Sequence, residues 1–155
     1  MMTEIRNTIE SDLEGLKDVL DSSELFPSEY LDEMISDYFK NPATEEIWFT
    51  NVSDGKIIGL GYCTSEKLTD GTYNLLAIAV RKDLQGNGEG KKMIGFIENL
   101  LLEKGHRILI VETSSDPAFE LTRKFYDQLG YRKEATIQDF WKDGEDKIVY
   151  WKKLK

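Results

Sequence analysis

The chain has 155 residues, about the length of one domain, and its 40% hydrophobic and 32% charged content is ordinary for a globular protein. Its formal net charge of −9 argues against non-specific binding to DNA or RNA, which requires Lys and Arg contacts to phosphates. The chain has no apolar run of the about 18 residues that a membrane span needs and no apolar signal at its N-terminus, so we expect a cytoplasmic protein that binds neither nucleic acid nor membrane.

The first part of the chain is predicted to form a strand, two helices and a hairpin. Ser11 and Glu14 match a capping box at the start of the first helix, which continues with an apolar stripe. Asp54 and Gly55 are typical of the tight turn of a β-hairpin. The predicted elements are, in order, a strand over 4–8, helices over 11–22 and 27–39, and strands over 45–52 and 56–64.

The second part is predicted to hold two strands that are apolar on both faces, over 74–80 and 107–114, each followed by a helix. The later helix begins with Asp116 as N-cap and Pro117 in its first turn, and it ends before Gly130. Two closing strands cover 131–141 and 147–154. The order β-αα-βββ-α-β-α-ββ predicts a mixed α+β fold, with helices packed on one sheet.

Three alternating glycines, Gly86, Gly88 and Gly90, separate the first apolar strand from its helix. Backbone without side chains at this place indicates either that another group approaches the main chain closely or that the turn needs a positive φ. The N-terminus of a helix binds phosphate well, yet the spacing matches neither G-x-G-x-x-G nor a P-loop. The residues alone leave a phosphate loop and a simple tight turn both open.

The run from Gln85 to Gly90, Q-G-N-G-E-G, resembles the acyl-coenzyme A signature Q/R-x-x-G-x-G/A of the GNAT superfamily of N-acetyltransferases. The opening EIRNTIESDLEGL and the later RKFYDQLGY are similar to two further motifs of this superfamily. The resemblance implies a single N-acetyltransferase domain over 1–155. It also implies a mostly antiparallel, twisted sheet of about seven strands, with a splayed central pair and about four flanking helices.

The resemblance further implies transfer of an acetyl group from acetyl-CoA to a primary amine by direct attack in a ternary complex, without a metal. The amides of the glycines and the helix dipole would receive the pyrophosphate, and the strand before the loop would bind the pantetheine arm through its main chain. Gln85 would orient a phosphate or cap the turn. The implied cofactor-binding residues are Ile78, Ala79, Val80, Arg81, Gln85, Gly86, Asn87, Gly88, Glu89, Gly90 and Lys91.

Acyl transfer to an amine requires a group that takes the amine proton, donors for the oxyanion and a proton for the departing thiolate. Tyr126 matches the tyrosine that protonates the thiolate in the superfamily, or else it is an aromatic at the edge of an apolar helix face. Glu112 continues an apolar strand face and is the candidate base, with a strand-end ion pair as the alternative. Asp139, Glu46 and a water chain are lesser candidates.

The single cysteine, Cys63, excludes an internal disulfide and is expected to be a small buried thiol, and the single histidine, His106, leaves too few ligands for a zinc site. The acceptor amine stays open between a small molecule and a peptide or protein N-terminus. The segments 21–34 and 137–147 are expected to contact it. A non-catalytic acyl-CoA sensor and an interaction module are alternative functions of the same fold, and a homodimer is possible.

Overall fold

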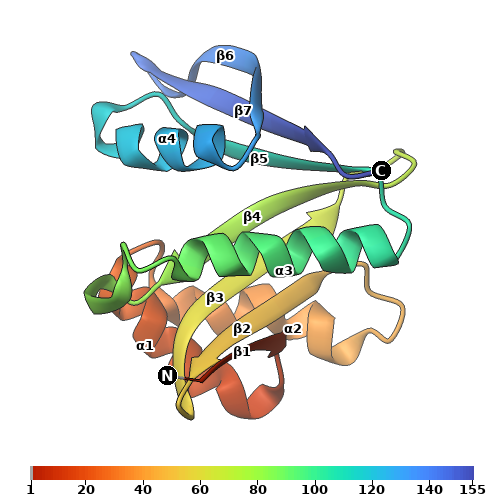
Figure 1. The fold of residues 1–155 in the computed structure, drawn as a ribbon, viewed down its shortest axis with the longest axis vertical. Helices are drawn as coiled ribbons and strands as arrows, with labels where there is room; N and C mark the ends of the chain where they lie inside the picture. Colours follow the sequence, from red (N-terminus) through yellow and green to blue (C-terminus); the bar gives the residue numbers. More distant parts are fainter. Residues whose placement is uncertain (1) are drawn as a thin grey trace. The chain divides into compact units, whose positions relative to one another are not determined.

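The structure is a computed structural model that describes residues 2–155. Over these residues it confirms the predicted mixed α+β fold and the predicted order of elements. A seven-stranded sheet has the order β1-β2-β3-β4-β5-β7-β6, and four α-helices accompany it (Figure 1). The bounds are β1 Thr3–Asn7, α1 Leu13–Ser23, α2 Leu31–Lys40, β2 Ile47–Ser53, β3 Lys56–Ser65, β4 Thr72–Val80, α3 Glu89–Glu103, β5 Ile108–Ser114, α4 Glu120–Gln128, β6 Arg132–Lys142 and β7 Glu145–Lys153.

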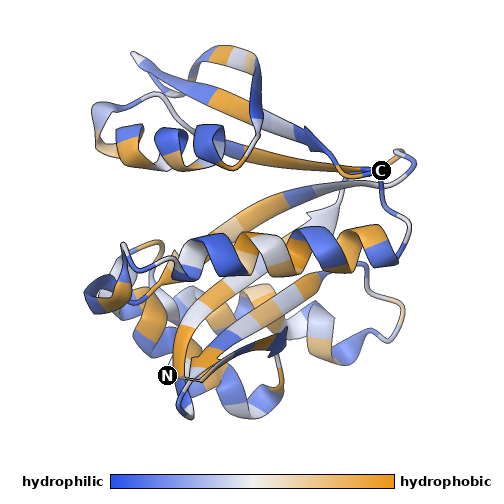
Figure 2. Cartoon of the chain, viewed as in Figure 1, coloured by the Kyte–Doolittle hydropathy of each residue, from blue (hydrophilic) through white to orange (hydrophobic). Residues whose placement is uncertain are grey.

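The chain divides into two compact units, and β4 and α3 each contribute to both. Unit 1 runs to Thr64 and includes Leu76–Ile97, whereas unit 2 consists of Ser65–Leu75 and Glu98–Lys155. The expectation that residues 1–155 make one domain stays a prediction. Apolar and hydrophilic residues alternate along α3 and α4, so each helix has an apolar face to bury (Figure 2).

Unit 1 packs helices on both faces of its strands (Figure 1). Trp48 and Phe49 are consecutive in β2, so their side chains point to opposite faces of the sheet. On the face of Phe49 lies α3, whose Phe96 ring is 5.4 Å from the Phe49 ring between centroids. On the face of Trp48 lie α1 and α2, and this core consists of Leu16, Val19, Leu20, Leu31, Ile35, Trp48, Leu60, Ala77 and Ala79.

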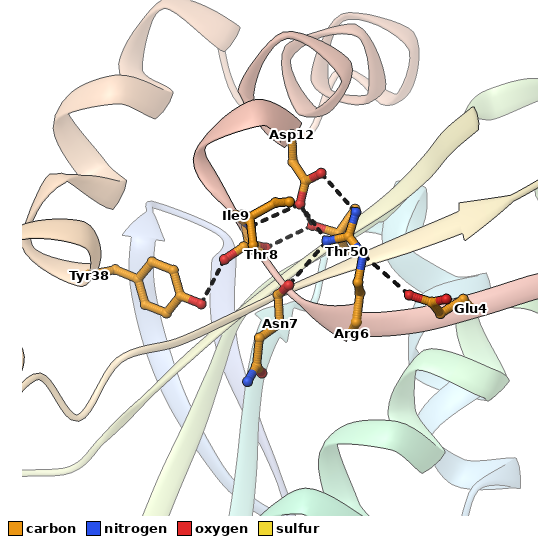
Figure 3. A network of polar contacts seen from close by, with 8 residues as sticks. All are labelled: Glu4, Arg6, Asn7, Thr8, Ile9, Asp12, Tyr38 and Thr50. Carbon is orange, nitrogen blue, oxygen red and sulfur yellow. Dashed lines mark hydrogen bonds and ion pairs between the residues drawn. The ribbon is translucent and has the colours of Figure 1, made fainter. Parts of the chain in front are cut away.

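The predicted capping box of Ser11 and Glu14 is wrong. A short 3-10 turn ends at Asp12, and α1 begins only at Leu13. The buried Asp12 carboxylate accepts a hydrogen bond from the Ile9 amide at 2.9 Å, which fixes the entry into the helix (Figure 3). Asp12 is the last residue of the 3-10 turn and its carboxylate reaches back to Ile9, the N-cap residue of that turn. The carboxylate is also held by partners outside the turn, which the exposed Ser11 hydroxyl does not have.

In unit 2 the sheet changes from parallel to antiparallel pairing. The first residues of β4, Thr72–Leu75, run parallel to Ile108–Val111 of β5, whereas β4 itself continues to Val80 in unit 1. Strand β5 pairs with β7, and β7 pairs with β6, in both cases antiparallel. Helix α4 covers one face of these strands through Tyr126, whose ring centroid is 5.8 Å from that of Tyr150 in β7.

The prediction that both apolar strands are buried on both faces is wrong. In β4, Leu76 is 48% exposed and Ile78 is only half-buried. In β5, Leu109 and Val111 are buried, while Ile110 on the other face is half-buried. The physical reason in β5 is that α4 covers the face of Val111, which stands opposite Tyr150, and leaves the other face less protected.

Candidate functional site

The glycine loop joins β4 to α3 in unit 1. Gly86 and Gly88 have φ values of 83° and 84°, a left-handed conformation that glycine adopts without strain. A Cβ atom added at either residue would meet no atom within 4 Å, so both face open space. Gly90 lies inside the first turn of α3 instead. The loop therefore offers bare, accessible backbone at two positions.

The N-terminus of α3 follows this loop directly. Lys92 donates its amide to the Gly88 carbonyl at 3.1 Å, and the amides before it, of Glu89, Gly90 and Lys91, have no acceptor within the helix. Unpaired amides and the positive end of the helix dipole favour an anion at this place. Lys91 is exposed and adds positive charge in the same turn.

Gln85 and Arg81 flank the loop on the side of the strand. The Gln85 Nε2 donates to the Val80 carbonyl at 3.0 Å, so of its two predicted roles the structure shows the cap of the turn. The Nε of Arg81 is buried without a hydrogen bond and lies 3.4 Å from Oδ1 of Asp83. Arg81 is therefore already ion-paired with Asp83, and an anionic ligand beside the loop would compete with that carboxylate.

These observations fit the pyrophosphate of coenzyme A, because they combine open glycine backbone with the free amides of a helix N-terminus. The side chains of the remaining predicted cofactor residues belong to the core or to the turn. Ala79 and Val80 are buried and Ile78 is half-buried, so their side chains belong to the core and only their main chain is suited to a ligand. Asn87 donates from its side chain to the Leu84 carbonyl at 3.3 Å and is a turn residue.

Glu89 follows the glycine loop directly, yet its side chain does not face solvent. Its side chain is buried, and Asn51 of β2 donates to its Oε1 at 3.3 Å. Lys92 lies 3.4 Å from its other carboxylate oxygen. The sequence gives no sign that Asn51 belongs to this site, because 38 residues separate it from Glu89.

Glu112 in β5 forms an ion pair with Lys147 of β7 at 2.6 Å. The Lys147 ammonium also lies over the ring of Phe140 in β6, 4.2 Å from its centroid. This is the alternative that the sequence left open, a strand-end carboxylate in an ion pair. The pairing does not test a role as base, but any such role has to operate beside the Lys147 ammonium, which sequence reasoning missed.

Tyr126 lies in α4 with 2% of its side chain exposed. Its ring packs edge-on against Tyr131 and is tilted against Tyr150. Burial raises the pKa of Tyr126 above that of a free tyrosine, so its hydroxyl keeps its proton at neutral pH. Glu112 stands opposite Val149 in the sheet, on the other face from Tyr150, so the structure places the two catalytic candidates on opposite faces of the unit 2 sheet.

The lesser candidates are engaged in local structure. The Asp139 carboxylate accepts the Gly144 amide at 2.8 Å within the β6–β7 hairpin, and Glu46 accepts the indole N–H of Trp48 at 3.0 Å. Cys63 is buried, which confirms the expected small buried thiol. Across residues 2–155 no cluster of His, Cys, Asp and Glu side chains could hold a metal ion, and none of the helices formed by them is long and apolar enough to cross a membrane.

Comparison with known proteins adds a family match and a relative. The sequence profile described as Acetyltransferase (GNAT) family matches residues 13–131. An uncharacterized N-acetyltransferase of Methanocaldococcus jannaschii is 25% identical over 154 residues, covering 96% of this chain and 90% of that protein.

Solved structures share the fold. A crystal structure from Desulfovibrio desulfuricans, described as an acetyltransferase of the GNAT family, has a TM-score of 0.93 at 24% identity and covers 99% of this chain and 100% of that chain. The ribosomal-protein-S18-alanine N-acetyltransferase of Escherichia coli has a TM-score of 0.79 at 18% identity, with coverage of 99% and 95%. At these identities the likeness shows the fold and leaves the acceptor open.

Proposed function

Because the chain belongs to the acetyltransferase (GNAT) family, whose enzymes use acetyl-CoA, we propose that it acetylates a primary amine of a small molecule or of a peptide or protein N-terminus. The amine attacks directly in a ternary complex. The observation that carries the proposal is the glycine loop, where Gly86 and Gly88 expose left-handed backbone beside the N-terminus of α3.

Acetyl-CoA supplies an activated thioester, whose thiol has a pKa of about 8.5 and leaves without covalent help from the protein. The loop amides bind and orient its pyrophosphate, which lowers the barrier by proximity. Tyr126 holds its proton because burial raises its pKa, so it acts as a hydrogen-bond donor to the departing sulfur. Glu112 lies on the opposite face of the unit 2 sheet from Tyr126, so it takes up the proton of the amine through a water chain, in competition with its ion pair to Lys147.

Tyr126→Phe is expected to lower kcat by about tenfold, because the hydroxyl donor is lost while the ring and its packing remain. The affinity for coenzyme A is expected to stay within about twofold, since the substitution removes only one hydroxyl and the predicted phosphate loop binds through its main chain. Steady-state kinetics and calorimetric binding on the same sample measure both quantities. An unchanged kcat across the pH range would remove the donor role and leave Tyr126 as a core aromatic.

Glu112→Gln is expected to lower kcat by about tenfold, less than the roughly hundredfold or more of an unhindered general base, because Lys147 already competes for the carboxylate. The pH–rate profile is the measurement, and its acidic limb is expected to flatten. Glu134→Gln is a matched control, since Glu134 is a carboxylate of β6 paired with Arg132 at the surface. Equal profiles for the parent and Glu112→Gln would assign the proton uptake to another group.

The decisive experiment is release of free thiol from acetyl-CoA in the presence of primary amines, including aminoglycosides, polyamines, amino acids and peptides with free N-termini, with calorimetric binding in parallel. Turnover with one class of amine supports the proposal and names the acceptor. Binding without turnover across the whole panel favours the non-catalytic sensor. Absence of binding favours the interaction module and contradicts the reading of the loop. The homodimer stays a prediction, which the molecular mass in solution tests.

A further inference from the structure

A buried carboxylate lies in the first turn of α3, where an anion is expected to bind. Glu89 is the first residue of the helix and its side chain is 3% exposed. Buried carboxylates are rare and are normally paired or hydrogen-bonded. Among residues 2–155, the partners of the Glu89 carboxylate are the side-chain amide of Asn51 at 3.3 Å and the ammonium of Lys92 at 3.4 Å, and Lys92 is itself half-exposed.

The sheet beneath α3 leaves room for Asn51, the hydrogen-bond partner of Glu89. Gly59 of β3 stands opposite Asn51 in the sheet. A Cβ on Gly59 would lie 2.8 Å from the Met93 sulfur and 3.0 Å from the Asn51 Cβ, so only glycine leaves room for Asn51 beneath α3. Asn51 is fully buried and its Oδ1 has no hydrogen-bond partner, so the contact to Glu89 is the polar interaction that holds this amide.

The negative charge of Glu89 has the same sign as the charge of the pyrophosphate and repels it. The amides and dipole of the helix N-terminus attract the pyrophosphate, whereas a carboxylate in the same turn repels it. Because Glu89 is shielded from water, this repulsion is screened less than that of a surface carboxylate. Lys92 offsets part of the repulsion, but its half-exposed ammonium is solvated and 3.4 Å away.

We propose that Glu89 sets the affinity of the loop for coenzyme A by its charge, and that Lys92 acts mainly by neutralising Glu89. The inference rests on the proposed function, since it assumes that the loop binds the pyrophosphate. The carboxylate weakens the complex, which favours release of coenzyme A after transfer. The hydrogen bond from Asn51 keeps the charge in place.

Glu89→Gln tests this directly, because glutamine keeps the shape and the hydrogen bond to Asn51 and removes the charge. Calorimetric titration of the full chain with coenzyme A is expected to show about tenfold tighter binding than for the parent. Glu103→Gln is the matched control. It makes the same change at the exposed end of α3, about 21 Å along the helix axis, and is expected to leave the affinity unchanged.

The first part of a second comparison uses two lysine variants and does not depend on the folding of the Glu89 variant. Lys92→Met uncovers the Glu89 charge, whereas Lys91→Met removes a neighbouring exposed lysine outside this ion pair. Lys92→Met is expected to weaken binding several-fold more than Lys91→Met, and this difference is expected to vanish in the Glu89→Gln background.

The outcomes separate the inference from the function on which it rests. If the parent binds coenzyme A but Glu89→Gln binds it equally or more weakly with an unchanged melting temperature, the charge of Glu89 does not set the affinity. Equal effects of the two lysine variants would likewise overturn the role of Lys92. If the parent itself binds no coenzyme A, the proposed function of the loop fails together with the inference.

Discussion

Gly88→Val is expected to lower the affinity for coenzyme A by about a hundredfold, or about 2.7 kcal/mol. Gly88 has a φ of 84°, where a β-branched residue is strained by roughly 1–3 kcal/mol, so the loop is expected to leave its present conformation. The valine side chain would also occupy the open space beside the amides of α3. Both effects remove backbone donors from the place where the pyrophosphate is expected to bind.

The control for this variant is Gly95→Ala, in the middle of the same helix. A Cβ on Gly95 would meet no atom within 4 Å, and its φ is not in the left-handed region. Alanine is expected to stabilise the protein by up to about 1 kcal/mol through helix propensity and to leave coenzyme A binding unchanged. Calorimetry and thermal unfolding measure both variants. If folded Gly88→Val bound coenzyme A with the affinity of the parent, the glycine loop would be a tight turn without a role in binding.

The order of elements was predictable because it depends on neighbours in the sequence. The Asp54-Gly55 hairpin turn forms with positive φ at both residues, and Asp116 caps the 3-10 turn that leads into α4 by accepting the Ala118 amide at 2.9 Å. Gly130 likewise has the positive φ expected after the end of a helix. Apolar periodicity and turn chemistry act over a few residues, so a single sequence contains them.

The partners of the charged groups were not predictable, because they depend on how distant segments meet. Glu112 of β5 forms an ion pair with Lys147 of the neighbouring strand β7, and Glu89 of α3 accepts a hydrogen bond from Asn51 of β2. The same limit explains the wrong cap at Ser11. Its spacing to Glu14 satisfies a local rule, yet the entry of the helix is decided by long-range contacts to the neighbouring residue. Local rules predict the place of the candidate site, and tertiary contacts decide its electrostatics.

Asp12→Ala is expected to destabilise the protein by about 3 kcal/mol, because it removes a buried carboxylate from a partly buried ion pair and leaves its partners unsatisfied. Arg6 forms two hydrogen bonds with the Asp12 carboxylate, at 2.8 and 3.0 Å, and the buried hydroxyl of Thr50 donates to it at 3.0 Å (Figure 3). The carboxylate thereby connects β1, β2 and the start of α1. Asp18→Ala, on the exposed side of α1, is the matched control and is expected to change the free energy of unfolding by less than about 0.5 kcal/mol.

The contribution of Asp12 is also expected to depend on pH. Burial alone would raise the pKa of Asp12, but the hydrogen bonds from Arg6 and the other donors outweigh it and lower the pKa below its ordinary value. A lowered folded-state pKa gives stabilisation that is fully present above the unfolded-state value of about 3.9 and is lost as the pH falls through the folded-state value. Denaturant unfolding between pH 7 and pH 2 should therefore show the parent and Asp12→Ala converging as the pH falls below about 4. A constant difference in the free energy of unfolding over this range would show that packing around Asp12, and not its charge, stabilises this junction.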